Sequence, residues 1–197
     1  MVKTLLKEVK EYKKDTFLSP VYVSIEAILE VCIPFLMAIL VDNGIEKGNM
    51  KSIWFYGFLM LVAAFVSLWA GAKSGKHAAI ASSGFAKNLR KAEYRKIQEF
   101  SFSNVDAYST SGLITRMMTD VTNIQNAYQM MIRVCVRAPL MLIASLVMAF
   151  IINKEMAMIF VAAVLVLGVV LFGIIFIVSP IFSRLFSQYD LLNASIQ

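Results

Sequence analysis

One stretch whose residue types could suggest nucleotide chemistry is GAKSGKH at residues 71–77. A Walker A loop, which cradles nucleotide phosphates, needs four residues between its glycines and a Ser or Thr directly after its lysine. Here three residues separate Gly71 from Gly75, and His77 follows Lys76. The stretch also lies inside a helical pattern, whereas a phosphate-binding loop follows a strand. It therefore predicts close helix packing at the two glycines.

Residues that could bind a metal ion are equally sparse. The sequence has one histidine and two cysteines, and Cys32 and Cys135 each stand alone in an apolar run. His77 has no second histidine or carboxylate at ligand spacing, and a zinc site needs several ligands placed close together. We therefore predict no metal site and no catalytic residues. The cysteines are expected to pack in the interior, and His77 to mark the inner membrane interface.

Four charged residues inside apolar runs are stronger candidates for a functional site. Glu26 and Glu30 lie one helical turn apart, and Arg133 and Arg137 enter a later apolar run. Ionisable side chains are costly in a bilayer, so they tend to pair with one another or to face a cavity. Three interpretations stay open for these residues: a structural ion pair, contact with a transported solute, or a proton relay.

The elements that must position these residues are membrane helices. Of the 197 residues, 59% are hydrophobic and only 16% are charged, which is typical of integral membrane proteins. The formal net charge is +6, but the lysines and arginines flank the apolar runs, as the positive-inside rule expects. The lipid bilayer, and not nucleic acid, is therefore the predicted partner. The predicted fold is an all-α membrane protein with four long transmembrane helices that extend into the cytoplasm.

The predicted spans are apolar runs of the length that crosses a bilayer, about 20 residues. Before them, residues 1–17 form a basic amphipathic helix that is expected to lie at the inner membrane surface, which places the N-terminus in the cytoplasm. Cations are more frequent on the predicted inner segments than on the outer loops, and this asymmetry supports the same orientation. The four spans are expected at residues 21–41, 53–72, 133–152 and 156–182.

The second and third spans are predicted to continue as a cytoplasmic arm over residues 73–132, interrupted by a polar turn at 104–112. No proline follows Lys73 before this turn, so one helix of roughly 70 Å would far exceed a hydrocarbon core of about 30 Å. A small polar tip on two long helices is suited to pass force to a soluble partner. After the turn, a coiled-coil-like seam is predicted at Leu113, Met117, Val121, Ile124, Tyr128, Met131 and Cys135.

Four stretches spread over nearly all of the chain carry a resemblance. They are PFLMAILVDNGIEKGN (34–49), FSNVDAYSTSGLITRMMTDVTNIQNA (102–127), RAPLMLIASLVMAF (137–150) and FSQYDLLNASIQ (186–197). In order and spacing they resemble the transmembrane domain of ABC exporters, in particular one half of the heterodimeric multidrug-type exporters. The resemblance implies that residues 18–197 are the first four spans of a six-span domain. It also implies a permease that couples ATP hydrolysis to the efflux of amphipathic or drug-like solutes.

The resemblance also assigns roles to particular residues. Residues 3–17 correspond to the elbow helix, and Ser111 stands where many members have Gly, with Gly112 one position later. The start of the third span's cytoplasmic part corresponds to Leu113, Arg116 and Asp120. The first coupling helix, which docks on a nucleotide-binding domain, corresponds to Asn104, Val105, Asp106, Ala107, Tyr108, Ser109 and Thr110.

The implied partners are a nucleotide-binding domain, which would bind ATP and Mg, and a second half-transporter in a heterodimer. No such domain follows in the sequence, so the chain alone is not expected to be an enzyme. The expected location is a plasma membrane, expected to be bacterial, with the N-terminus in the cytoplasm. The alternative is a complete four-span membrane scaffold without enzymatic activity, whose arms dock a soluble partner. The uncapped helical pattern that reaches Gln197 favours the exporter interpretation.

The orientation can be tested with single cysteines. Cysteines replacing Lys47 and Lys154 are expected to react with a membrane-impermeant maleimide on intact cells, because both positions lie in predicted outer loops. A cysteine at Tyr108 is expected to react only after permeabilisation. Labelling of position 108 on intact cells would overturn the predicted topology.

Overall fold

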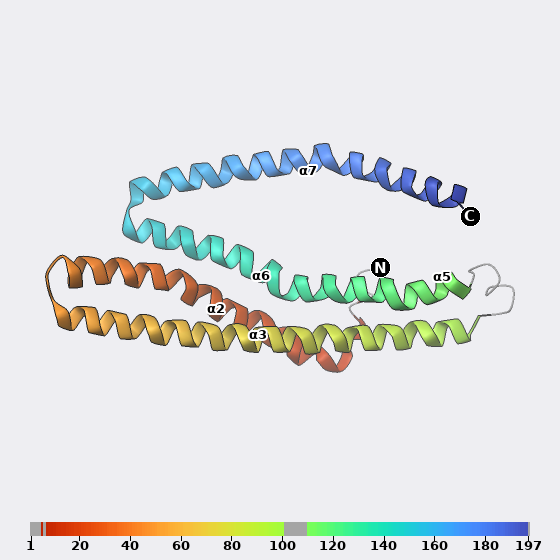
Figure 1. Ribbon diagram of the computed structural model, residues 1–197, viewed down its shortest axis with the longest axis horizontal. Coiled ribbons are helices and arrows are strands. Elements are labelled where there is room, and N and C mark those ends of the chain that lie inside the picture. Colours follow the sequence, from red (N-terminus) through yellow and green to blue (C-terminus); the bar gives the residue numbers. More distant parts are fainter. Residues whose placement is uncertain (1–4, 6, 101–109, 197) are drawn as a thin grey trace. The chain divides into compact units, whose positions relative to one another are not determined.

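The structure, a computed structural model, describes residue 5 and residues 7–100 and 110–196. It divides into two compact units, Met1–Ser145 and Leu146–Gln197, which are considered separately below. The described residues are helical except in short turns, and they contain no strand. Four of the helices are long and apolar enough to cross a membrane, as judged by length and composition. The predicted all-α membrane fold is therefore confirmed (Figure 1).

Brief 3-10 or π segments precede or follow the long helices of the described chain. In chain order, the elements are the 3-10 helix η1 (Lys7–Tyr12), α2 (Lys13–Leu40), the π-helix η2 (Val41–Ile45), α3 (Met50–Gln98), α5 (Thr110–Thr115), the π-helix η3 (Arg116–Asp120), α6 (Val121–Ile152) and α7 (Lys154–Ile196).

Helix α3 is a single element of 49 residues, about 70 Å long at the usual rise per residue. It therefore joins the predicted second span to the predicted arm without a break, as the sequence indicates. At its start, the side chain of Asn49 accepts a hydrogen bond of 3.2 Å from the backbone N–H of Lys51, which caps the helix. The turn before it is shorter than the sequence suggests, because η2 continues the helix through Ile45.

The N-terminal segment differs from the single amphipathic helix expected over residues 1–17. The segment η1 is a short 3-10 helix with a break at Lys10, whose φ is 38° and ψ is −112°. Helix α2 then begins at Lys13 and passes through Pro20 and Pro34. The sequence predicts a span only from residue 21, but α2 already includes residues 13–20, and two hydrogen bonds hold these earlier turns in place. They are Thr16 to the Tyr128 hydroxyl (2.8 Å) and Ser74 to the Ser19 carbonyl (3.1 Å).

Small residues on α3 allow α2 to lie close beside it. The two helices run side by side in Figure 1, and the Ser19–Ser74 contacts join them. Close approach of two backbones in a membrane is typical of helices that present Gly, Ala and Ser to each other. The buried small residues of α3, spaced three or four apart along one face, are Ala63, Ser67, Ala70, Ser74, Ala78 and Ala81.

The apolar core of the first unit lies where η1, α3 and α6 meet. The rings of Phe85 and Tyr128 pack with their centroids 4.7 Å apart, and Val9 fixes η1 to the same cluster. This core lies outside the predicted spans, so it joins the parts of the helices that extend beyond them. Its buried members are Val9, Ala78, Ala81, Phe85, Ala86, Leu89, Val121, Tyr128 and Ile132.

The seam predicted on α6 is correct in its middle and wrong at its end. Val121 and Tyr128 are buried, whereas Met131 is 54% exposed and Cys135 is also exposed. The buried face continues at Ile132 instead. A straight α-helix has 3.6 residues per turn and does not follow the 3.5-residue coiled-coil repeat assumed for the prediction. The expectation that Cys135 packs in the interior is therefore wrong for this unit.

Helix α7 belongs to the second unit, and its segment Lys154–Pro180 is strongly apolar. Side chains such as Val169, Phe172 and Phe176 are between 66% and 75% exposed. At its start, the side chain of Asn153 accepts hydrogen bonds from the backbone N–H groups of Glu155 (2.9 Å) and Met156 (3.2 Å). Contiguous exposed apolar surface of this extent marks contact with membrane or other protein.

Gly84 provides a test of how η1 is held against α3. A Cβ atom at Gly84 would meet the ring of Tyr12 closer than side-chain carbons are ever found. Gly84→Ala is therefore expected to lower the free energy of unfolding by about 1–3 kcal/mol, because the Tyr12 ring must move away from α3. Thermal unfolding of the purified protein would measure the loss.

Gly57 on the same helix is the matched control, because nothing lies within 4 Å of the corresponding Cβ position. Gly57→Ala should leave the stability unchanged or raise it by roughly 0.5–1 kcal/mol, the usual difference between Ala and Gly inside a helix. Equal effects of the two substitutions would show that the Tyr12 ring does not pack against Gly84.

Candidate functional site

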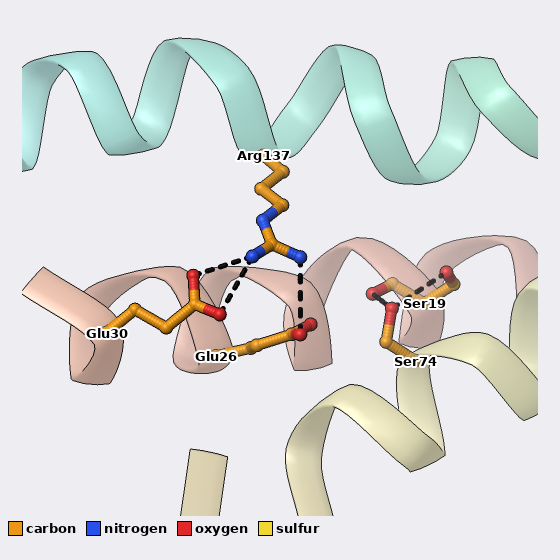
Figure 2. Close-up of polar contacts among 5 residues, drawn as sticks. All are labelled: Ser19, Glu26, Glu30, Ser74 and Arg137. Carbon is orange, nitrogen blue, oxygen red and sulfur yellow. Dashed lines mark hydrogen bonds and ion pairs between the residues drawn. The ribbon is translucent and has the colours of Figure 1, made fainter. Parts of the chain in front are cut away.

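The candidate site is a cluster of three charged side chains within the membrane helices. Glu26 and Glu30 come from α2, and Arg137 comes from α6 (Figure 2). The Nη2 group of Arg137 donates to both carboxylate oxygens of Glu30, at 2.8 and 2.7 Å. Its Nη1 group donates to Oε1 of Glu26 over the longer distance of 3.3 Å. The guanidinium therefore bridges two carboxylates that lie one helical turn apart.

Gly71 of α3 explains how the Glu26 carboxylate fits between the helices. A Cβ atom at this position would lie 2.7 Å from Oε1 of Glu26 and 2.9 Å from its Cδ. A larger residue would force the Glu26 carboxylate to move, so the predicted close packing at Gly71 is present. At Gly75 the nearest atom, Nη1 of Arg133, would be at an ordinary 3.7 Å. The two glycines therefore have different roles.

The two glutamates differ in burial and in their partners. The side chain of Glu26 is 11% exposed, whereas those of Glu30 and Arg137 are about one third exposed, at 33% and 32%. The second oxygen of Glu26, Oε2, is buried and accepts no hydrogen bond within the described part of the chain. A buried carboxylate oxygen without a donor is costly. Glu26 is therefore the less satisfied of the two acids.

Arg133 does not join this cluster. Among the residues that the structure describes, it forms no hydrogen bond or ion pair, and its guanidinium lies near Gly75. The sequence offered Arg133 and Arg137 as equivalent partners for the acids. The structure brings only Arg137 to them, which leaves two carboxylates facing one guanidinium.

Polar contacts continue from the cluster toward the start of α2. His77 Nδ1 lies 2.7 Å from Oδ1 of Asp15, and its ring stacks on Tyr22 with the centroids 5.6 Å apart. The sequence has no carboxylate at ligand spacing from His77, because Asp15 lies 62 positions away in the chain. Only the antiparallel register of α2 and α3 could have indicated this pair.

Tyr128 on α6 forms a second polar contact near the start of α2, with Thr16. Its hydroxyl lies 2.8 Å from Oγ1 of Thr16, and its ring belongs to the apolar core. Burial raises the pKa of the Tyr128 phenol, and the hydrogen bond with Thr16 opposes this to a smaller extent. The phenol is therefore neutral at physiological pH and can serve as a hydrogen-bond donor.

The predicted coupling residues fall mostly outside the described part of the chain. Thr110 is described and is the first residue of α5. The predicted coupling residues outside the described part are Asn104, Val105, Asp106, Ala107, Tyr108 and Ser109. Of the residues assigned to the arm, Leu113 is half-buried and Asp120 is exposed, while the side chain of Arg116 is not described. Their predicted roles stay predictions.

A contact that sequence reasoning missed joins the two helices of the arm. Arg90 on α3 donates from Nε to the backbone carbonyl of Met117 (3.3 Å) and from Nη2 to Oγ1 of Thr122 (3.2 Å). Thr122 in turn donates to the carbonyl of Met118 at 2.6 Å. The only sequence signal for this contact was that the basic residue Arg90 precedes the turn and a polar stretch with Thr122 follows it. The contact ties α3 to the start of α6 beside the π-helix η3.

Comparison with known proteins identifies the family of this chain. Residues 16–197 match the family described as the ABC transporter transmembrane region. The chain belongs to this family. It is also 30% identical over 172 residues to the ABC transporter ATP-binding protein YfiB of Bacillus subtilis (strain 168). That match covers 87% of this chain and 30% of the relative.

Two further relatives place the ABC transmembrane region in context. An ABC transporter ATP-binding protein of Mycobacterium tuberculosis (strain H37Rv) is 26% identical over 201 residues, covering 98% of this chain and 33% of that protein. An ATP-dependent lipid A-core flippase of Albidiferax ferrireducens is 26% identical over 140 residues, 71% of this chain and 24% of the flippase. The chain spans about a third of the length of the curated relatives it matches. It is a multi-pass membrane domain of an ABC transporter.

Gly71 offers a test of the cluster. Gly71→Ala is expected to lower stability by about 1–3 kcal/mol, because the new methyl group displaces the Glu26 carboxylate and weakens its bond to Arg137. Gly75→Ala is the matched control and should have little effect, since its Cβ would meet only an ordinary contact. Thermal unfolding of the purified protein would compare them.

A double substitution separates this mechanism from general overpacking of α3. In Glu26→Ala/Gly71→Ala, the methyl group at position 71 no longer meets a carboxylate, so its cost should largely disappear and the two effects should not add. Strictly additive losses would show that the alanine at 71 disturbs something other than Glu26.

Proposed function

We propose that the chain is part of the permease of an ATP-driven exporter. The observation that carries this proposal is the continuity of α3 and α6 in an ABC transmembrane domain. Both helices extend beyond their apolar segments and pack on each other through the core around Phe85 and Tyr128. Such a packed pair is suited to carry a displacement from the polar turn to the spans.

In this proposal, the chain forms part of the solute pathway, and hydrolysis takes place elsewhere. A nucleotide-binding domain binds ATP and Mg and docks on the turn that contains Asn104 and Thr110. The names of the relatives support this partner, because several are called ATP-binding proteins and extend well beyond the matched region. A second half-transporter completes the pathway as a heterodimer in the plasma membrane, with the N-terminus in the cytoplasm.

The proposed solutes are amphipathic or drug-like. Two features of the chain and its relatives support this class. One relative is named a lipid A-core flippase, and a lipid is an amphipathic solute. In this chain, a charge cluster lies among the apolar side chains of α2 and α6, so polar and apolar groups are presented together. The alternative, a four-span scaffold, has weaker support because the family match extends along residues 16–197.

Tyr108 tests the coupling in the complete assembly. It is the largest of the apolar side chains in the predicted coupling helix, so it is expected to anchor that helix in a groove of the nucleotide-binding domain. Tyr108→Ala should keep membrane insertion but reduce the solute transported per ATP hydrolysed. Transport into inverted vesicles, measured together with phosphate release, gives this ratio.

Tyr94 is the matched control for this experiment. It is an aromatic residue on the same arm, lies on α3 and is 54% exposed. Tyr94→Ala should leave the ratio of transport to hydrolysis unchanged. If Tyr108→Ala behaves like Tyr94→Ala, and a cysteine at position 108 forms no crosslink to the nucleotide-binding domain, the turn is only a connection between helices.

A further inference from the structure

We propose that Glu30 binds the ammonium group of a cationic amphipathic solute, and that Arg137 moves from Glu30 to Glu26 when this cation arrives. This inference rests on the proposed function and names the solute class of the same site. It assigns the two acids different tasks. Glu30 is the carboxylate that meets the ligand, and Glu26 is the carboxylate that holds the displaced guanidinium.

The unequal sharing of Arg137 is the first observation that leads to this assignment. The Nη2 group makes two short contacts of 2.8 and 2.7 Å with Glu30, but Nη1 reaches Glu26 only at 3.3 Å. Short charge-assisted hydrogen bonds are the strong ones. The described state is therefore one in which the arginine belongs mainly to Glu30, with Glu26 already within reach of its other nitrogen.

The second observation is that Glu26 has an acceptor position without a donor. Its Oε2 atom is buried and has no hydrogen-bond partner among the residues described, and the residue as a whole is only 9% exposed. Burial of an unsatisfied carboxylate oxygen is unfavourable. A full two-bond contact with Arg137 would remove this cost. Figure 2 shows the heads of all three side chains converging on the same place.

Gly71 leaves room for the Glu26 carboxylate on the surface of α3. The carboxylate lies where a side chain at position 71 would stand, so Glu26 lies directly against α3. The Glu30 side chain is 33% exposed, against 11% for that of Glu26. A ligand can therefore reach Glu30 more easily than Glu26. The exposure of Arg137, 32%, shows that the Glu30–Arg137 pair is accessible as a unit.

The charge of the cluster identifies the sign of the ligand. Two carboxylates and one guanidinium carry a formal charge of −1, and Arg133 contributes no ion pair with the described residues. An uncompensated charge inside a membrane protein is costly. One monovalent cation makes the cluster neutral, as two pairs: the ligand with Glu30, and Arg137 with Glu26. An ammonium group can also donate hydrogen bonds to the carboxylate it meets.

The experiment compares two probes that differ only in their charged end. One is a dansyl-labelled long-chain primary amine, and the other is the corresponding alcohol. Binding of each to the assembled transporter in lipid nanodiscs is measured by fluorescence anisotropy without ATP. The wild type is expected to prefer the amine by about tenfold, the effect of one favourable ion pair of ordinary strength.

Three variants test the separate tasks. Glu30→Gln should abolish the preference for the amine and leave alcohol binding unchanged. Glu26→Gln should weaken amine binding by several fold, because Arg137 loses its second partner and competes more strongly for Glu30. Arg137→Gln should strengthen amine binding, because the competitor is gone. Should Arg137→Gln fail to fold, the contrast between the two glutamine variants still decides the proposal.

Glu46→Gln is the matched control, since this exposed carboxylate lies in the turn before α3, outside the cluster. It should change neither affinity. Equal wild-type affinity for amine and alcohol would overturn the proposal, as would an unchanged amine preference in Glu30→Gln. A purely structural ion pair would instead make Arg137→Gln weaken the binding of both probes equally.

Two further outcomes separate this inference from its alternatives. If the variants change the pH dependence of alcohol transport but not the amine preference, the cluster binds a proton and the proposal is wrong. If the wild type transports neither probe when ATP is supplied, the proposed exporter function fails. The binding measurement needs no ATP, so it still decides whether Glu30 selects a cation.

Discussion

The close approach of α2 to α3 is the constraint on which the rest of the first unit depends. It is possible because α3 presents Ala, Ser and Gly along one face, so the two backbones approach each other without intervening side chains. Once this face is in contact, the antiparallel register is fixed. Ser19 then lies at Ser74, Glu26 lies at Gly71, and Asp15 reaches His77.

This register sorts the polar residues of α2 by their surroundings. Glu26 falls in an apolar stretch, where it needs a cation, and the only cation that reaches it among the described residues is Arg137 from α6. Asp15 and Thr16 fall nearer the N-terminus, where they meet His77 and Tyr128. The position of each polar residue along α2 therefore decides whether it joins the charge cluster or forms hydrogen bonds with His77 and Tyr128.

Much of this arrangement follows from local features of the sequence. Four apolar runs of sufficient length, the absence of proline between Lys73 and the turn, and the glycine at position 71 predict the spans, the long α3 and a point of close packing. These features need no knowledge of the neighbours. The charged residues in apolar runs were also visible as candidates, because ionisable groups there are rare and costly.

The remaining features depend on packing between distant segments. Arg133 and Arg137 lie one turn apart on α6, so only the position of that helix along α2 decides which of them meets the acids. The break at Lys10 has no local signal, because a positive φ is uncommon at a residue other than glycine. The continuation of the buried face at Ile132, in place of Met131, likewise follows from the twist of a straight helix.

Helix α6 links the charge cluster to the arm. Arg137 lies nine residues, about 14 Å, beyond Tyr128, whose ring is fixed in the core against Phe85. The intervening turns are regular helix, which transmits displacement along its axis with little loss because its hydrogen bonds resist stretching. A guanidinium that exchanges Glu30 for Glu26 moves between acids one turn apart on α2. Any strain from that exchange acts on α6, and α6 is also the helix that Arg90 ties to α3 near the turn.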